Sequence, residues 1–138
     1  MSDDGHVSSN DTNGLIGGKF RVQGDIKSLL GYQTVTCEDT DSGQLVELRL
    51  LPTDVLAKHG AVLSVQRAIK KAGALAHKNL ARVVGYGKAQ TDIFVVEEHV
   101  KGPLLSHLLT RRRDTQRPFE LKEAFYLTIH LCNGLAFA

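Results

Sequence analysis

The sequence predicts an α+β fold in which a five-stranded antiparallel sheet carries one helix and is followed by two C-terminal helices. Three features support this prediction. Residues 19–51 alternate as strands do, residues 81–100 form a second pair of strand-like runs, and residues 120–138 repeat apolar side chains at helical spacing. With 138 residues, the chain is long enough to form one domain with a sizeable core.

The composition excludes several classes of protein. Hydrophobic residues make up 42% of the chain and charged residues 23%, which is ordinary for a soluble globular protein. The net charge of +2 is too small to indicate a nucleic-acid partner. The sequence shows no secretory signal and no apolar run near the roughly 18–20 residues of a membrane span. Cys37 and Cys132 lie far apart in no metal-binding spacing, and both are expected to be reduced and buried. We therefore expect a soluble, cytoplasmic protein without a metal site.

The first strands follow a polar start. Residues 1–14, "MSDDGHVSSNDTNG", hold almost no apolar groups to offset the entropy lost on ordering, so residues 1–16 are expected to form a flexible tail. Strands are then expected in residues 19–30, 33–39 and 44–51. The "DTDSG" between the last two is a hairpin signal, which makes three consecutive antiparallel strands the expected result.

Helices and a second hairpin fill the rest of the chain. A helix is predicted over residues 61–74, where apolar residues follow helical spacing. The two runs within residues 81–100 should form a hairpin, and "LLSHLLTRRR" at 104–113 a short helix. The clearest helix covers residues 120–138. Five of its side chains define one apolar face: Leu121, Phe125, Ile129, Cys132 and Leu135.

Two polar runs allow more than one interpretation. "RRRD" at 111–114 has the charge to bind phosphate or acidic partners, but basic residues in the last turn of a helix also suit its dipole, and we favour the dipole. "EEH" at 97–99 suggests metal ligands. However, consecutive strand residues point to opposite faces, so a structural hinge is favoured over a metal site.

Taken in order, these segments resemble the N-terminal lobe of bacterial-type Ser/Thr protein kinases. "FRVQGDIKSLLGYQTVTCEDTDSGQLVELRLL" resembles the first three strands of that lobe, and "HKNLARVVGYG" its H-P-N-I-V…G segment. "FVVEEHVKGPLLSHL" resembles the strand, hinge and following helix, and "EAFYLTIHLCNGLAFA" the start of helix E. The resemblance covers residues 19–138. It implies a kinase N-lobe-like domain over residues 17–102 and a segment resembling kinase helices D and E over residues 103–138.

The resemblance also implies a degenerate nucleotide site. Arg49 occupies the position of the V-A-I-K lysine, and Glu47 that of the alanine that packs on adenine. The helix C glutamate position falls on Ala68 and the gatekeeper on Glu97. The three glycine positions of the phosphate loop hold Lys27, Leu29 and Tyr32. Arg49 is expected to pair with Glu47 or Glu97 instead, although an exposed, solvated face remains an equal alternative for Glu47 and Arg49.

These changes predict a protein that is not an enzyme. The sequence contains neither H-R-D-x-x-x-x-N nor D-F-G, so the family's catalytic base and metal ligands are missing from it. We expect no cofactor, since the positions that hold ATP are altered. The expected function is a pseudokinase-like scaffolding module in bacterial signalling or assembly, which binds a protein partner and self-associates through the C-terminal helices or a sheet edge. The alternative is the N-lobe of a larger pseudokinase that binds nucleotide as a regulatory ligand.

Overall fold

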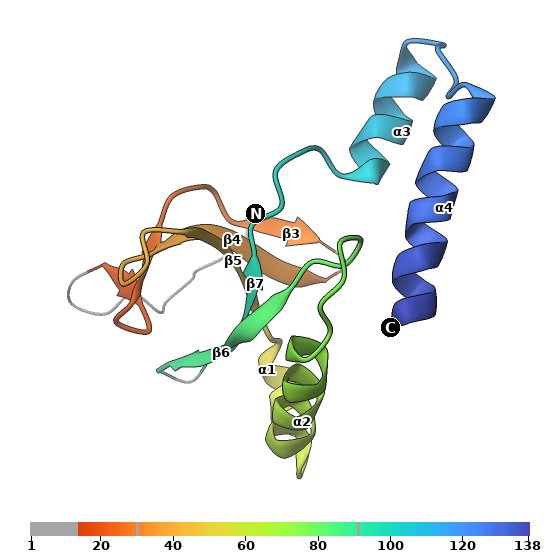
Figure 1. Ribbon diagram of the computed structural model, residues 1–138. Helices are drawn as coiled ribbons and strands as arrows, with labels where there is room; N and C mark the ends of the chain where they lie inside the picture. The colour runs from red at the N-terminus through yellow and green to blue at the C-terminus, as the bar shows by residue number, and fades with distance from the viewer. Residues whose placement is uncertain (1–13, 30, 91) are drawn as a thin grey trace. The chain divides into compact units, whose positions relative to one another are not determined.

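The computed structural model describes residues 14–29, 31–90 and 92–138 (Figure 1). The contacts within the chain divide it into two units. The first contains Met1–Leu75 and Arg82–His99, and the second contains Ala76–Ala81 and Val100–Ala138. Residues 1–13 of the predicted tail lie outside the described residues. The predicted domain boundaries at 16/17 and 102/103 stay predictions.

The first unit is built on one antiparallel sheet. Its strands follow the order β1-β2-β4-β5-β7-β6, and β3 pairs with β4 beside this path. The seven strands of the described residues are β1 Leu15–Ile16, β2 Phe20–Val22, β3 Lys27–Leu29, β4 Tyr32–Asp39, β5 Leu45–Leu50, β6 Val83–Ala89 and β7 Asp92–Glu98. The α+β class and the two predicted hairpins are therefore confirmed.

The predicted first strand is interrupted and β1 precedes it, and these two differences raise the number of strands from five to seven among the described residues. β2 pairs with Cys37–Asp39 at one end of β4, and β3 pairs with Tyr32–Thr34 at its other end. Between them Gly24 and Asp25, both poor strand formers, break the ladder, and only the Gln23 N–H still donates to the Thr36 carbonyl, at 2.9 Å. β1, which the sequence analysis placed in the tail, adds a two-residue edge that pairs with β2.

A continuous apolar core lies on one side of this sheet. Phe94 at its centre is 1% exposed and meets Phe20 edge to face, with ring centroids 5.7 Å apart. The buried cluster comprises Ile16, Phe20, Val35, Cys37, Val46, Leu48, Ala89, Phe94 and Val96. Every second residue of β4 and β5 points into it, so the polar residues between them must lie on the opposite face.

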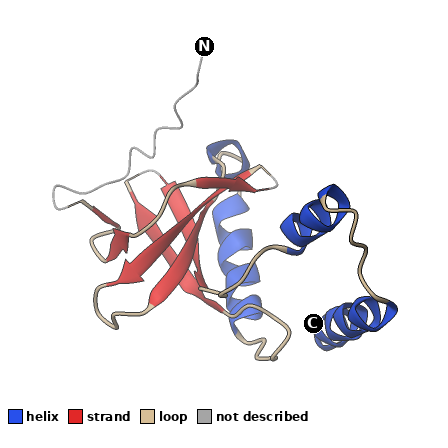
Figure 2. Cartoon of the chain, turned by 90° about the horizontal axis from the view of Figure 1, so that it is seen from above, coloured by secondary structure: helices blue, strands red, loops and turns tan. Residues whose placement is uncertain are grey.

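Two helices belong to the first unit. α1 spans Thr53–Leu56 and α2 spans Ala61–Gly73, close to the predicted range of 61–74. α2 packs beside β6 (Figure 2) and buries Ile69. Lys70 and Lys71 lie in its last turn, where positive charge suits the helix dipole.

The second unit is a helix pair with a short loop against it. α3 spans Leu105–Asp114 and α4 spans Leu121–Phe137. A reciprocal capping box starts α4, in which the Glu120 N–H donates to the Glu123 carboxylate at 2.9 Å. Near the other end of α4, His77 stacks on Phe137 at 4.9 Å between ring centroids. Among the described residues, no helix combines the length and the apolar character that crossing a membrane requires.

Candidate functional site on the polar face of the sheet

Arg49 on β5 forms an ion pair with Glu97 on β7. Its Nη2 donates to Glu97 Oε2 at 2.9 Å, and the two side chains are 35% and 21% exposed. The strand register places Arg49 opposite Val95, so Glu97 lies one diagonal step away on the same face. Of the two carboxylates that the sequence offered to Arg49, the structure pairs it with Glu97.

Glu47 has partners of its own on the same face. Its Oε1 lies 2.6 Å from His99 Nδ1 and accepts a hydrogen bond from the Thr36 hydroxyl at 2.8 Å. The register places Thr36, Glu47 and Glu97 side by side on β4, β5 and β7. We call Thr36, Glu47, Arg49, Glu97 and His99 the polar face of the sheet. The sequence analysis assigned no partner to His99, because the contact depends on a register that spacing alone does not give.

The polar face places two carboxylates side by side and gives each of them a compensating partner. Glu47 and Glu97 are directly opposite one another, an arrangement that destabilises a sheet when both carboxylates are ionised. Arg49 neutralises one carboxylate, while Thr36 and His99 hold the other. Two buried polar atoms beside this arrangement, Thr34 Oγ1 and Arg49 Nε, have no hydrogen-bond partner among the described residues. Thr34 and Arg49 are opposed across β4 and β5, so the two atoms belong to neighbouring positions.

The phosphate-loop positions carry side chains. Lys27 and Leu29 lie in β3, and Tyr32 begins β4. The turn between the strands contains Gly31, which has a φ of +79°. The resemblance assigns these three positions to the glycine-rich loop, whose bare backbone amides approach phosphate closely in a kinase.

Helix α2 supplies no carboxylate to Arg49. The position that the resemblance assigns to the helix C glutamate is Ala68, which is exposed. No Asp or Glu occurs anywhere in α2, whose charged residues are Arg67, Lys70 and Lys71. Arg49 therefore pairs within the sheet, whereas the resemblance leads us to expect a pair between sheet and helix.

These residues fit the two halves of ATP differently. The carboxylate of Glu47, held by His99 and Thr36, stands where the resemblance expects a small apolar side chain against adenine. Adenine packing would leave this carboxylate desolvated, so the residues do not fit the base. Arg49 keeps a positive charge at the phosphate position, but Glu97 already holds one of its nitrogens.

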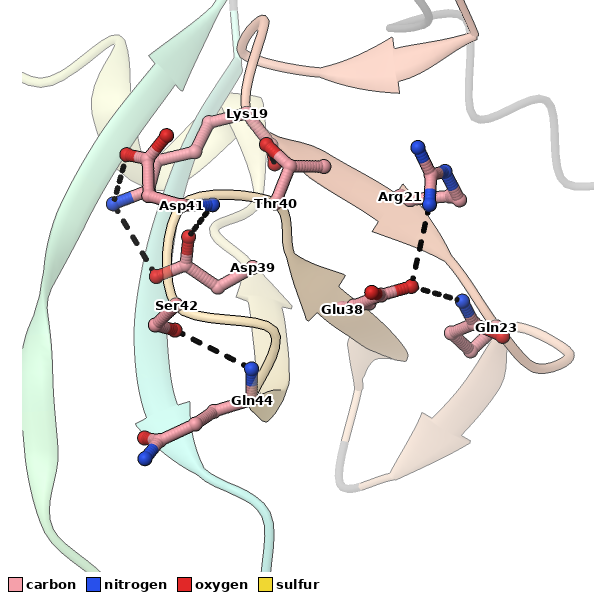
Figure 3. Close-up of polar contacts among 9 residues, drawn as sticks. All are labelled: Lys19, Arg21, Gln23, Glu38, Asp39, Thr40, Asp41, Ser42 and Gln44. Carbon is pink, nitrogen blue, oxygen red and sulfur yellow. Dashed lines mark hydrogen bonds and ion pairs between the residues drawn. The ribbon is translucent and has the colours of Figure 1, made fainter.

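A second polar cluster fixes the β4–β5 turn (Figure 3). Lys19 Nζ lies 3.3 Å from Asp39 Oδ2 and 3.1 Å from Asp41 Oδ2. Hydrogen bonding to Asp41, and then to Asp39, raises the pKa of Lys19 above its usual value. Partial burial acts to raise the pKa of Asp39, but the Asp41 N–H and Lys19 together outweigh it and lower this pKa. These contacts join turn and strand residues and serve the fold.

The apolar face of α4 is exposed. Leu121, Ile129 and Leu135 expose 73%, 56% and 66% of their surface, and Phe125 and Cys132 are exposed as well. The prediction that Cys132 is buried is therefore wrong, because its helical position shares this uncovered face. Cys37 is buried as predicted, and burial, with a smaller contribution from the charge of Glu47, raises its pKa to about 11.

The histidines and acidic residues that the structure describes form no metal cluster. Within the part of the chain that the structure describes, no group of three or more His, Cys, Asp or Glu side chains has the arrangement to hold a metal ion. His77 Nδ1 accepts a hydrogen bond from the Asn79 N–H at 3.2 Å and so fixes the loop after α2. His130 Nδ1 lies 3.2 Å from Asn79 Oδ1.

Comparisons with known proteins find distant kinase relatives. No protein-family model matches the chain. CBL-interacting protein kinases 33 and 32 of Oryza sativa subsp. japonica are each 26% identical to it over 87 residues, which cover 59% of this chain. The matched segment covers 19% and 20% of those two proteins, so the chain spans only about a fifth of their length.

Solved structures give a stronger likeness. A mutant form of the PknI kinase domain of Mycobacterium tuberculosis superposes with a TM-score of 0.76 and 14% sequence identity, covering 96% of this chain and 51% of that domain. Another structure of the same kinase domain gives a TM-score of 0.74. At this level of identity the likeness establishes the fold.

These findings correct one prediction and confirm another. The prediction that the protein is not an enzyme is contradicted, since its relatives and structural neighbours are protein kinases. That prediction was drawn from altered side chains and missing motifs in a sequence that covers 51% of the similar kinase domain. The recognition of the lobe is confirmed: the chain has the fold of the N-terminal lobe of a protein kinase.

Proposed function

We propose that this kinase-related chain is a protein-interaction module that self-associates through the apolar face of α4. The observation that carries the proposal is the exposure of that face, which presents Leu121, Phe125, Ile129 and Leu135 along a 17-residue helix. A contiguous apolar surface in water is a liability unless another surface buries it. A second copy of the chain offers the same stripe, and two identical stripes are complementary about a two-fold axis.

Light scattering across a range of concentrations tests the proposal. The wild-type chain should show a mass that rises from one copy to two, and Ile129→Asp should remain at the mass of one copy at every concentration. Leu63→Asp on α2 is the matched control. Leu63 is 59% exposed, against 56% for Ile129, but it lies on another helix, so this variant should assemble as the wild type does. A wild-type chain that stays monomeric at every concentration would overturn the proposal.

A second candidate function is the binding of a nucleotide, through its phosphates, as a regulatory ligand. Arg49 favours it, because its buried Nε has no hydrogen-bond partner among the described residues and its charge matches phosphate. A titration with ATP, with and without Mg²⁺, tests this candidate. Binding that Arg49→Ala abolishes and Arg21→Ala preserves would support it, whereas no binding at millimolar nucleotide would contradict it.

A further inference from the structure

The last turn of α3 and the connection that follows it concentrate the positive charge of the chain. Residues 111–117, "RRRDTQR", hold four of the 17 basic residues and one of the 15 acidic residues. The segment therefore carries +3, and the remainder of the chain, with 13 basic and 14 acidic residues, carries −1. We call the exposed guanidinium groups of Arg111, Arg113 and Arg117 the arginine surface.

Among the described residues, the three guanidinium groups of the arginine surface form no ion pair apart from one between sequence neighbours. Arg112, the fourth arginine, is half-buried: it pairs with Glu123 at 2.8 Å and lies over the ring of Phe119, 4.9 Å from its centroid. In contrast, no carboxylate of the described residues lies within 4 Å of the guanidinium groups of Arg111 or Arg117. Arg113 reaches only its neighbour Asp114, at 3.5 Å.

Positive charge in the last turn of α3 suits the helix dipole, but the hydrogen bonds at this end of the helix do not need the arginine side chains. The last carbonyls of α3 already accept backbone hydrogen bonds, since the N–H groups of residues 115, 116 and 117 donate to Arg111, Arg113 and Arg112 respectively. The Thr115 hydroxyl donates to the Arg111 carbonyl as well, at 2.8 Å. The end of the helix is therefore satisfied without any arginine side chain, and the guanidinium groups stay available to a ligand.

Two adjoining cavities give this region a polar half and an apolar half. Arg111, Arg117 and Thr115 line a cavity of about 660 Å³. Phe119, Tyr126 and Leu127 line a second cavity of about 410 Å³. Leu108 and Arg112 border both, so the two cavities adjoin along one side of the α3–α4 pair.

We propose that the α3–α4 turn binds an acidic segment of a partner protein, with one apolar side chain in the Phe119–Tyr126 cavity and carboxylates along the arginine surface. Charge complementarity selects an anionic partner, because the exposed guanidinium groups of Arg111 and Arg117 have no carboxylate within 4 Å among the described residues, and that of Arg113 has only the exposed Asp114. The arginines spread along an exposed turn, which suits several spaced carboxylates. The apolar cavity beside them selects a segment that also carries a leucine-sized or aromatic side chain.

Fluorescence anisotropy with labelled synthetic peptides tests this proposal on the full 138-residue chain. The probe is a ten-residue peptide with four glutamates and one leucine, measured beside a version with serine in place of the leucine. The double variant Arg111→Glu with Arg117→Glu should weaken binding of the leucine peptide at least tenfold. The serine peptide should bind the wild-type chain several-fold more weakly than the leucine peptide does.

A matched control distinguishes binding at the arginine surface from attraction to the overall charge of the chain. The double variant Lys58→Glu with Arg67→Glu makes the same change of charge at exposed positions of the first unit, and it should bind the leucine peptide as the wild type does. Equal loss in both double variants would overturn the proposal. So would a chain that binds vesicles of anionic phospholipid but not the peptide, because the arginine surface would then recognise a membrane.

Discussion

Arg49 and Glu97 are joined at 2.9 Å across the neighbouring strands β5 and β7, on the face of the sheet where the resemblance places a nucleotide. In a kinase, the cation at this position reaches a carboxylate on helix C. Here α2 contains no carboxylate, and the partner comes from the neighbouring strand. The charge at residue 49 therefore helps to hold the sheet together.

Substitutions of Arg49 and Glu97 should lower the free energy of unfolding by different amounts. Arg49→Ala removes the ion pair and leaves Glu47 and Glu97 facing one another, so it should lower the free energy of unfolding by about 1–2 kcal/mol. Glu97→Gln removes the same ion pair but also ends the repulsion, so its cost should stay below about 0.5 kcal/mol. Urea unfolding of both variants measures the difference. Equal losses would contradict the arrangement of like charges.

Any larger residue at position 87 should lower the stability of the fold, because a Cβ atom there would overlap the ring of Phe94. Gly87→Ala should therefore cost about 1–3 kcal/mol through displacement of a buried aromatic side chain. Gly85→Ala on the same strand is the control, since nothing lies within 4 Å of its added methyl group. Thermal unfolding should separate the two variants, and a Gly87→Ala protein as stable as Gly85→Ala would show that Phe94 is placed differently.

Glu123 should make the start of α4 sensitive to acid. The Glu120 N–H, and then Arg112, hold the pKa of Glu123 below its usual value of 4.5. A lowered pKa means that the ionised form stabilises the folded state above pH 4.5, and that this contribution disappears as the pH falls through the folded pKa. The wild type should thus be more stable than Glu123→Gln at pH 7, and the two should converge in acid. Urea unfolding at several pH values checks this, and a difference that does not change with pH would contradict it.

The sequence predicted the large periodic elements well and the local interruptions poorly. The range 61–74 anticipated α2, and the runs within residues 81–100 anticipated the β6–β7 hairpin, because both patterns depend on which side chains face the core. The break between β2 and β3 escaped prediction. Gly24 and Asp25 lie inside an otherwise strand-like run, and two residues do not show whether a strand bends or ends.

The sequence was also a poor guide to the individual contacts of the polar face. The resemblance offered Glu47 and Glu97 as candidate partners for Arg49, and the strand register pairs Arg49 with Glu97. His99 received no partner from the sequence, although it lies within hydrogen-bonding distance of Glu47. The contact joins residues 52 positions apart, so it becomes visible only when β5 and β7 are aligned. The signal was the alternation itself, which places Glu97 and His99 on one face of the strand.

The alkylation rate of Cys132, measured at low and high protein concentration, tests self-association through α4 most directly. Cys132 is exposed on the apolar face, while burial and a pKa of about 11 keep Cys37 unreactive near pH 7.5 and make it an internal control. If two copies join through this face, iodoacetamide should modify Cys132 several-fold more slowly at high concentration, and Ile129→Asp should restore the fast rate. A Cys132 rate that is the same at every concentration would contradict self-association through α4.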